Sequence, residues 1–424
     1  MIINRRYSYI FIAFILLVTI LRAILIFNTY GSTDLRARIV GARLMSENKS
    51  PYFYKWKPGD NEKILDPNVN TNREVNGNVV TPAYLILLQS VSQLPYYEIQ
   101  VIWGILQCLF LCLVTWMITR YLPLVNRENV VLLILTVLLF SFSGIWVYNI
   151  ERGQTYTLFA FLFCLVVIPA VTKPAKFSLI SGFINGLIGF LRPSFFLLII
   201  VFFVRKNYRF CLAQIIGATV GLLLFVVPYY DVWKDFFNAM HLYSLEIING
   251  MPSYQSIQNS PNVIERLSSL RNVDKDIHLS AILSAQNYLK NIGIVLNSTT
   301  STLICMAFIS CYSYLFYKKQ LFLDNTKTIL FAFLIYITAE YFFIGARGSY
   351  SIIQWILPVC IFVYNARWQR TVLLLFAFSQ IFVIPSLPFN NSQNFQGLIG
   401  EGILYVVCIY DIFVRKSNIL IKAG

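Results

Sequence analysis

Charged residues are scarce in this sequence. Of its 424 residues, 12% are charged and 57% are hydrophobic, whereas a soluble domain carries about 25% charged residues. This deficit argues against an ordinary soluble enzyme. Apolar runs of about 18–22 residues recur along the whole chain, and in lipid only helices and closed barrels satisfy their own backbone polar groups. The sequence therefore predicts an all-α, polytopic integral membrane protein.

Several features of soluble and secreted proteins are missing as well. The chain has no Gly-x-Gly-x-x-Gly motif of a nucleotide-binding domain, no internal repeat and no low-complexity tract. All eight cysteines lie within predicted helices rather than in long loops, so we expect neither disulfides nor a metal cluster. The first apolar run, residues 8–28, lacks a small-residue cleavage site, and we interpret it as a membrane span rather than a signal peptide.

Positive charge, in contrast, is in excess. The formal net charge is +15, but the basic residues lie mostly in short loops between apolar runs and not on one soluble face, as nucleic-acid binding would require. We therefore interpret them as topology signals and expect no nucleic-acid partner. About twelve spans are predicted, at residues 8–28, 99–119, 129–149, 155–171, 178–191, 194–204, 210–229, 293–317, 328–345, 350–365, 371–385 and 398–414.

The placement of residues 81–95 determines the predicted orientation of the chain in the membrane. This segment is apolar but only about 15 residues long, which fits a juxtamembrane helix better than a span. With the segment outside, seventeen Lys and Arg lie in the inside termini and loops and three lie in the short outside loops, as the positive-inside rule requires. Both termini are then cytoplasmic, and two long loops, residues 29–98 and 230–292, face outward from a single domain of residues 1–424. Their mixed charge and many Asn, Tyr and Trp residues indicate an active site on the outer face.

Three short outer loops each carry one arginine, at Arg152, Arg192 and Arg347. Because cations are disfavoured there, we expect these side chains to bind an anion, and the planar guanidinium suits phosphate. The phosphate of a membrane lipid would lie at this depth. In the alternative interpretation, each arginine snorkels or pairs with an acid, for instance Arg152 with Glu151. Glu340, an acid inside a predicted span, is expected to orient Arg347, or to carry protons if the protein is a transporter.

A charged stretch at residues 32–53 follows the first predicted span. It contains an apolar stripe at helical spacing, which predicts a helix lying in the membrane interface; the stripe consists of Leu35, Ile39, Ala42 and Met45. We expect the side chain of Ser32 or Thr33 to cap this helix. Arg36 and Arg43 share another face, which is predicted to face water.

Asp34 falls in the first turn of this predicted helix, and Arg38 lies four residues on, where the two can form an ion pair. In one interpretation, Asp34 only complements the helix dipole. In the other, a carboxylate fixed at the depth of a lipid phosphate acts as a general base on a lipid-borne substrate.

The order of short motifs along the chain carries a resemblance to a known family. The motifs are Asp34, Asn48-Lys49-Ser50-Pro51-Tyr52, Thr81-Pro82-Ala83-Tyr84, Gly153-Gln154, Arg192-Pro193, and Gln258-Asn259-Ser260 with Arg266 downstream. Up to the second long outer loop, the chain resembles the GT-C superfamily of polyprenyl-phosphate-sugar-dependent glycosyltransferases. Within that superfamily it is most similar to the branch of actinobacterial phosphatidylinositol-mannoside α-mannosyltransferases, although Arg192 replaces the usual lysine.

This resemblance implies a GT-C-like fold with juxtamembrane helices in the first outer loop. The donor would be a polyprenyl-phosphate hexose, with mannose as the first candidate, and the acceptor a glycan or glycolipid at the outer face of the cytoplasmic membrane. Asp34 would deprotonate the acceptor hydroxyl, which attacks the anomeric carbon with inversion. No cofactor or metal is implied. The donor phosphate would be bound by Arg192, Arg347, Arg152 and Arg266, and the substrates by Gln154, Asn259, His241, Tyr52 and Tyr84.

Two other functions remain open from the residues alone. A transporter or flippase for a lipid-linked saccharide would use the same arginines to bind phosphate, but would be expected to show repeats and charges deep in the membrane. An O-antigen polymerase or ligase would also combine outer arginines with a large outer loop, for which residues 230–292 qualify. Neither needs an aspartate-led juxtamembrane helix directly after the first span, so Asp34 discriminates between the hypotheses.

Overall fold

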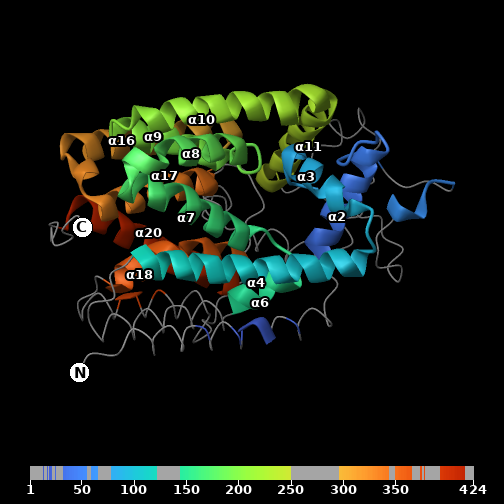
Figure 1. The fold of residues 1–424 in the computed structure, drawn as a ribbon, viewed down its shortest axis with the longest axis horizontal. Coiled ribbons are helices and arrows are strands. Elements are labelled where there is room, and N and C mark those ends of the chain that lie inside the picture. The colour runs from blue at the N-terminus through green and yellow to red at the C-terminus, as the bar shows by residue number, and fades with distance from the viewer. Residues whose placement is uncertain are drawn as a thin grey trace.

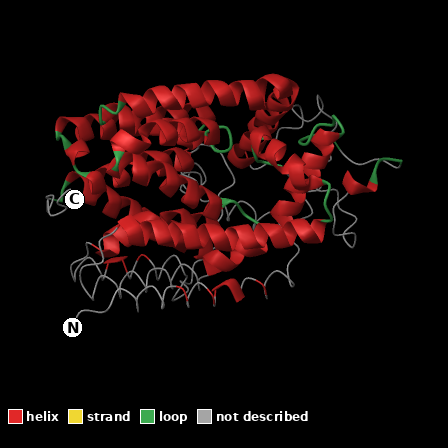
Figure 2. Cartoon of the chain, in the orientation of Figure 1, coloured by secondary structure: helices red, strands yellow, loops and turns green. Residues whose placement is uncertain are grey.

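The computed structural model describes residues 32–54, 59–64, 78–121, 144–249, 296–342, 349–364 and 392–415, with a few isolated residues before residue 25 and between residues 373 and 377. Within these ranges the regular structure is entirely helical (Figure 2). The predicted all-α fold is therefore confirmed for the part of the chain that the structure describes.

Figure 1 shows how the described helices are arranged. They are α2 (Thr33–Ser46), η1 (Glu62–Ile64), α3 (Pro82–Ser92), α4 (Tyr96–Tyr121), α6 (Gly144–Glu151), α7 (Tyr156–Thr172), α8 (Pro174–Ile188), η3 (Pro193–Leu197), α9 (Leu198–Val204), α10 (Tyr208–Gly221), η4 (Leu222–Val226), η5 (Val227–Tyr229), α11 (Tyr230–Asn249), α16 (Ser298–Lys318), η6 (Leu321–Leu323), α17 (Asn325–Phe342), η7 (Ser349–Trp355), α18 (Ile356–Tyr364) and α20 (Ser392–Phe413).

Within the described ranges, three helices are long and apolar enough to cross a membrane: Tyr96–Tyr121, Tyr208–His241 and Thr299–Lys318. A fourth span results if the bent pair α6 and α7, which meet at 109°, crosses as one broken helix. The structure thus supports a helical membrane protein but does not confirm about twelve spans. Several of the predicted spans are shorter helices, and the predicted spans 8–28 and 371–385 lie almost wholly outside the described residues.

One predicted boundary is wrong. The span predicted to end at residue 229 continues as helix through His241, so the start of the segment predicted as the second long outer loop is the helical α11. The reason is packing: Trp233 and Phe236 of α11 are buried, and the ring of Phe236 lies 5.7 Å from that of Tyr52. Burial of these aromatic side chains stabilises a helix in a segment whose composition suggested a loop.

The centre of the bundle is α17, whose residues 327–340 are all buried. It packs against α7, α9, α16 and α20. A helix that is apolar on every side requires such complete burial. Helices α8 and α10 pack against each other (Figure 1), and glycines lie at their contact. A Cβ atom added at Gly186 would lie 2.3 Å from the carbonyl oxygen of Gln214, and one at Gly217 would lie 2.2 Å from that of Phe183, which is the small-residue packing common in membranes.

The helical backbone is interrupted at Arg192-Pro193, between the predicted spans 178–191 and 194–204. Helix α8 ends at Ile188, and Pro193 opens the short η3, which leads into α9. Proline disfavours helix at the residue before it, and Arg192 is extended. The side chain of Asn185 donates a 2.9 Å hydrogen bond to the carbonyl of Phe195, which satisfies a backbone group that the break leaves open.

Helices α2 and α3, from the segment predicted as the first outer loop, pack against each other. A helix is observed as α3 within residues 81–95, where one was predicted. The apolar stripe of α2 is buried inside the protein, against the prediction that this helix lies in the membrane interface. The prediction that Arg36 and Arg43 face water is wrong, because both side chains are buried. Arg43 donates to the carbonyls of Ser92 and Leu94 at the end of α3, at 2.7 and 3.1 Å, and to that of Lys63 at 2.9 Å.

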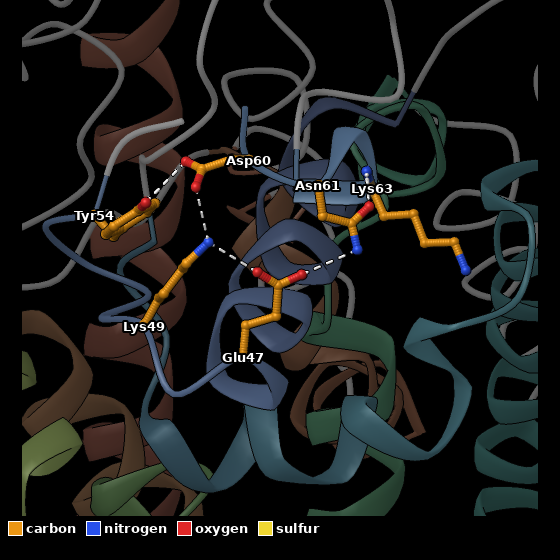
Figure 3. A network of polar contacts seen from close by, with 6 residues as sticks. All are labelled: Glu47, Lys49, Tyr54, Asp60, Asn61 and Lys63. Atoms are coloured by element: carbon orange, nitrogen blue, oxygen red, sulfur yellow. Dashed lines mark hydrogen bonds and ion pairs between the residues drawn. The ribbon is translucent and has the colours of Figure 1, made fainter. Parts of the chain in front are cut away.

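A network of polar contacts stabilises the segment that follows α2 (Figure 3). Lys49 donates to Glu47 at 2.9 Å and to Asp60 at 3.2 Å, and the hydroxyl of Tyr54 donates to Asp60 at 2.8 Å. The hydrogen bond to Glu47 is the main reason that the pKa of Lys49 is raised. These contacts connect the residues after α2 to the segment before η1.

Candidate functional site

The first turn of α2 is capped by a distant loop. The backbone N–H groups of Asp34 and Leu35 donate to the carbonyl of Arg152, at 3.1 and 3.3 Å. The expected side-chain cap is absent: Ser32 has a left-handed backbone, and its hydroxyl accepts a hydrogen bond from Gln100 at 3.2 Å instead. The turn between α6 and α7 thus satisfies backbone donors that a helix start leaves unpaired.

Gln154, from the same turn, bridges the two charged residues at the start of α2. Its side-chain N–H donates to Oδ2 of Asp34, and its Oε1 accepts a 2.9 Å hydrogen bond from Nη2 of Arg38. Nη1 of Arg38 donates to the carbonyl of Gly153 at 2.8 Å. The predicted i,i+4 ion pair between Asp34 and Arg38 is therefore replaced by an amide that contacts both, across 120 residues of sequence.

Gly153 permits this close approach. Its φ is +64°, in the left-handed region, and a Cβ atom there would lie 2.6 Å from the Cβ of Leu35. Both the conformation and the space require glycine. The predicted Gly153-Gln154 motif is thus a tight turn that brings Gln154 against Asp34. Asp34 remains partly accessible while Gln154 and Arg38 are buried, so the carboxylate lies at the open edge of the cluster.

Two buried amides that the sequence interpretation missed support the turn from behind. Gln107 of α4 donates to the carbonyl of Gln154, and Asn149 of α6 donates to Oε1 of Gln107 at 3.1 Å and to the hydroxyl of Thr157 at 2.9 Å. The N–H of Gln154 donates to the carbonyl of Asn149 at 2.8 Å. The available signal was an amide side chain inside each of two apolar segments, because buried polar groups need partners.

An aromatic pair connects two of the predicted phosphate-binding arginines. The guanidinium of Arg152 lies 5.8 Å from the ring centre of Tyr350, and that of Arg192 lies 5.5 Å from the ring centre of Tyr156. The two tyrosine rings are 5.4 Å apart. These are cation–π distances, so Arg152 and Arg192 flank one tyrosine pair and belong to one region of the molecule.

Arg192 is also bound to an acid. Its Nε donates to both carboxylate oxygens of Glu340, at 2.9 and 3.0 Å, and its Nη2 donates to Oε2. Ser194 donates to the other carboxylate oxygen. Glu340 was expected to orient Arg347, which lies outside the described residues, so that expectation stays a prediction. In the structure Glu340 binds Arg192 instead. Nη1 of Arg192 has no hydrogen-bond partner within the described part of the chain, and the side chain is 26% exposed.

The remaining predicted site residues have different surroundings. Tyr52 is fully buried, and its hydroxyl donates to the carbonyl of Val80 at 2.8 Å. Tyr84 is buried beside Arg38, whose guanidinium lies 5.8 Å from its ring centre; burial raises the pKa of Tyr84 to about 12. His241 is exposed on α11. Asn259 and Arg266 lie outside the described residues, so their roles stay predictions.

This arrangement can perform acid–base chemistry next to an anion. A partly accessible carboxylate is oriented by an amide and a buried guanidinium, and two further guanidinium groups lie on either side of a tyrosine pair. Within the described residues, no group of three His, Cys, Asp or Glu side chains is placed to bind a metal ion.

Comparison with known proteins gives one match. The model of the family described as glycosyltransferase family 87 matches residues 80–320, which is more than half of the chain. The matched range contains Gln107, Asn149, the Gly153-Gln154 turn and Arg192, and begins after Asp34. No curated protein and no solved structure matches the chain.

Proposed function

The chain belongs to glycosyltransferase family 87, and on this premise we propose that it transfers a hexose from a polyprenyl-phosphate sugar to a lipid- or glycan-linked acceptor. The family establishes a membrane glycosyltransferase that acts on a sugar donor and an acceptor. The proposal adds the class of donor, mannose as the first candidate sugar, inversion at the anomeric carbon, and a site on the outer face of the cytoplasmic membrane. Membership also favours transfer over the transporter and polymerase hypotheses.

The contact of Gln154 with Asp34 carries the proposal. One carboxylate oxygen accepts from Gln154, which leaves the other for the acceptor hydroxyl. As the base takes the hydroxyl proton, the acceptor oxygen bonds to the anomeric carbon, and the bond from that carbon to the phosphate oxygen breaks. The electron pair leaves with the polyprenyl phosphate, so a single displacement inverts the anomeric configuration. A positioned base of this kind accelerates a reaction by about 10²–10⁴-fold.

The arginines supply the electrostatic part. Negative charge grows on the leaving phosphate, and guanidinium groups already in place stabilise it without reorganisation. Arg152 and Arg192 flank the tyrosine pair in the structure, and Nη1 of Arg192 is available for a phosphate oxygen. Arg347 and Arg266 are proposed to join them from segments outside the described residues.

Asp34→Asn tests the base. The purified protein is placed in proteoliposomes with radiolabelled polyprenyl-phosphate mannose and a total lipid extract of the source organism as acceptor. We expect the variant to fold and to bind polyprenyl phosphate, with transfer reduced at least about 100-fold. Asp60→Asn, in the network of Figure 3, is the matched control and should retain activity. Transfer near the unmodified rate by the Asp34→Asn protein contradicts the mechanism.

The donor is tested in the same assay by comparing polyprenyl-phosphate hexoses and pentoses with nucleotide sugars. Transfer from a polyprenyl-phosphate hexose alone supports the proposed donor class. Transfer from a nucleotide sugar in the absence of polyprenyl phosphate contradicts it, while leaving the family assignment intact.

A further inference from the structure

The turn that carries Gln154 forms a hydrogen bond with a side chain of α4, a helix long and apolar enough to span a membrane. Gln107 is fully buried in α4, and its Nε2 donates to the backbone carbonyl of Gln154. The same turn contacts α2 at several points: the Arg152 carbonyl caps the helix start, and Gly153 and Gln154 bind Arg38. The turn is therefore a link between α4 and the start of α2.

The orientation of the Gln107 amide is set by its partner. Asn149 donates to Oε1 of Gln107 at 3.1 Å, so the amide nitrogen of Gln107 must face the opposite way, toward the Gln154 carbonyl. Asn149 is itself fixed by Thr157, whose hydroxyl accepts from the same nitrogen at 2.9 Å. Gln107, Asn149 and Thr157 are each at most 1% exposed. Asn149 donates both of its side-chain hydrogen bonds, to Gln107 and Thr157, whereas its Oδ1 accepts none within the described part of the chain. The donations from Asn149 therefore set the direction of the Gln107 amide.

We propose that Gln107 is a positioning residue of the enzyme: its amide holds the Gly153-Gln154 turn so that Gln154 presents its N–H to Asp34. This inference rests on the proposed role of Asp34 as the base. Gln107 does not touch the carboxylate itself. Its effect passes through the backbone of Gln154, and a shift of the turn changes the direction in which the carboxylate meets the acceptor hydroxyl.

Removing the Gln107 side-chain amide should change the rate of hydrogen exchange at the start of α2. In the Gln107→Leu variant the Gln154 carbonyl loses its donor, and the turn is less firmly held against the start of α2. The N–H groups of Asp34 and Leu35, which donate to Arg152, should then exchange with deuterium about tenfold faster, as expected when one buried hydrogen bond no longer opposes local opening. Hydrogen exchange of a peptide covering residues 33–40 in detergent or nanodiscs measures this.

Gln214→Leu is the matched control. Gln214 is also a buried glutamine in a membrane helix, and its Nε2 donates to the carbonyl of Phe196 at 2.8 Å, with no contact to the turn. It undergoes the same chemical change and should lower the melting temperature comparably without changing exchange in α2. If Gln107→Leu changes α2 exchange no more than Gln214→Leu does, then Gln107 only packs α4 and the inference is wrong.

Kinetics separate this inference from the proposed function. Per folded molecule, Gln107→Leu should lower kcat at least about tenfold, since small misplacements of reacting groups cost up to about 100-fold, and Gln214→Leu should not. Gln107→Glu should regain kcat as the pH falls, because only the protonated acid can donate to the Gln154 carbonyl. If Asp34→Asn abolishes transfer while Gln107→Leu keeps full kcat, the positioning role of Gln107 is wrong and the proposed function still holds. If the Asp34→Asn protein stays active, the role of Asp34 as the base is wrong. The hydrogen-exchange experiment then still tests whether Gln107 holds the turn against the start of α2.

Discussion

Gly153 is the residue at which the turn between α6 and α7 comes closest to α2. Its positive φ and its approach to Leu35 impose two separate demands, one on the backbone and one on space. The left-handed conformation costs a residue with a side chain about 1–2 kcal/mol, and overpacking a tight contact costs about 1–3 kcal/mol. Because Gln154 is the next residue, a displaced turn also moves its amide away from Asp34.

Gly153→Ala is therefore expected to lower both stability and kcat. Thermal unfolding in detergent measures the first effect and the transfer assay measures the second. Gly59→Ala is a suitable control, since Gly59 also has a positive φ, of +98°, but a Cβ atom there meets nothing within 4 Å. The control should show the backbone cost alone, of about 1–2 kcal/mol, with kcat unchanged. Equal stability and equal kcat for the two variants would mean that the contact with Leu35 has no consequence.

The pair of Arg192 and Glu340 gives a second residue-scale prediction, about phosphate affinity. Glu340 is nearly fully buried and forms an ion pair with Arg192, so its carboxylate competes with any phosphate that approaches the guanidinium. Arg192→Gln should weaken binding of polyprenyl phosphate about tenfold or more, as expected for loss of one charged hydrogen bond of about 1.5–3 kcal/mol. Glu340→Gln should strengthen binding, because it frees the cation. Both single variants lose a buried partner and are expected to be less stable by about 3–5 kcal/mol.

The double variant Arg192→Gln/Glu340→Gln keeps this prediction testable. It removes both charges together, so it avoids an unpaired buried ion and should be more stable than either single variant. Its affinity for polyprenyl phosphate should match that of Arg192→Gln. Binding that is the same in all four proteins would remove Arg192 from the phosphate site and leave the pair with a structural role.

At the scale of elements, the sequence predicts the two juxtamembrane helices well and their contacts poorly. The periodicity of α2 and the length of α3 are local properties, and both helices are observed. The surroundings of the arginines are not local. Arg43 was expected in water because it falls off the apolar stripe, yet carbonyls from the end of α3 and from η1 surround its guanidinium. Helical spacing describes neighbours within one helix, so it cannot predict a contact with carbonyls from other segments of the chain.

Arg43→Lys tests how α2 fixes α3. A planar guanidinium reaches three carbonyls at once, whereas a lysine ammonium on a flexible stem cannot reproduce that fork. Burial lowers the pKa of Arg43, but the side chain remains a cation, so the substitution keeps the charge and changes only the geometry. We expect a loss of about 1–3 kcal/mol in the free energy of unfolding, measured as a lower melting temperature. Lys63→Ala leaves the Lys63 carbonyl in place and should have no such effect; an unchanged melting temperature for Arg43→Lys would contradict the capping role.

At the scale of the whole molecule, composition predicts the class of protein but not its number of spans. Low charge and long apolar runs correctly indicated a helical membrane protein. Hydropathy alone cannot tell a full span from a short buried helix, because both are apolar on every side. The helices after Pro193 and at Tyr350–Tyr364 are apolar but too short to cross by length, and the predicted spans there were counted as full. The pairing of Arg192 with Glu340, 148 residues away, likewise depends on tertiary packing.

The last prediction concerns which side of the membrane holds the site. Tyr96, at one end of α4, donates to the carbonyl of Ser32, and Tyr121, at the other end, lies 3.3 Å from the hydroxyl of Thr326. The 26 residues of α4 extend about 39 Å, more than a hydrocarbon core of about 30 Å, so we expect the two ends of this helix to face opposite compartments. Glu62 and Gln320 are exposed and can each be replaced by cysteine. The Glu62→Cys protein should react with a membrane-impermeant maleimide in intact cells, whereas the Gln320→Cys protein should react only after permeabilisation. The unmodified chain gives the background reaction of the native cysteines. The reverse pattern would place the site in the cytoplasm and exclude a donor presented at the outer face.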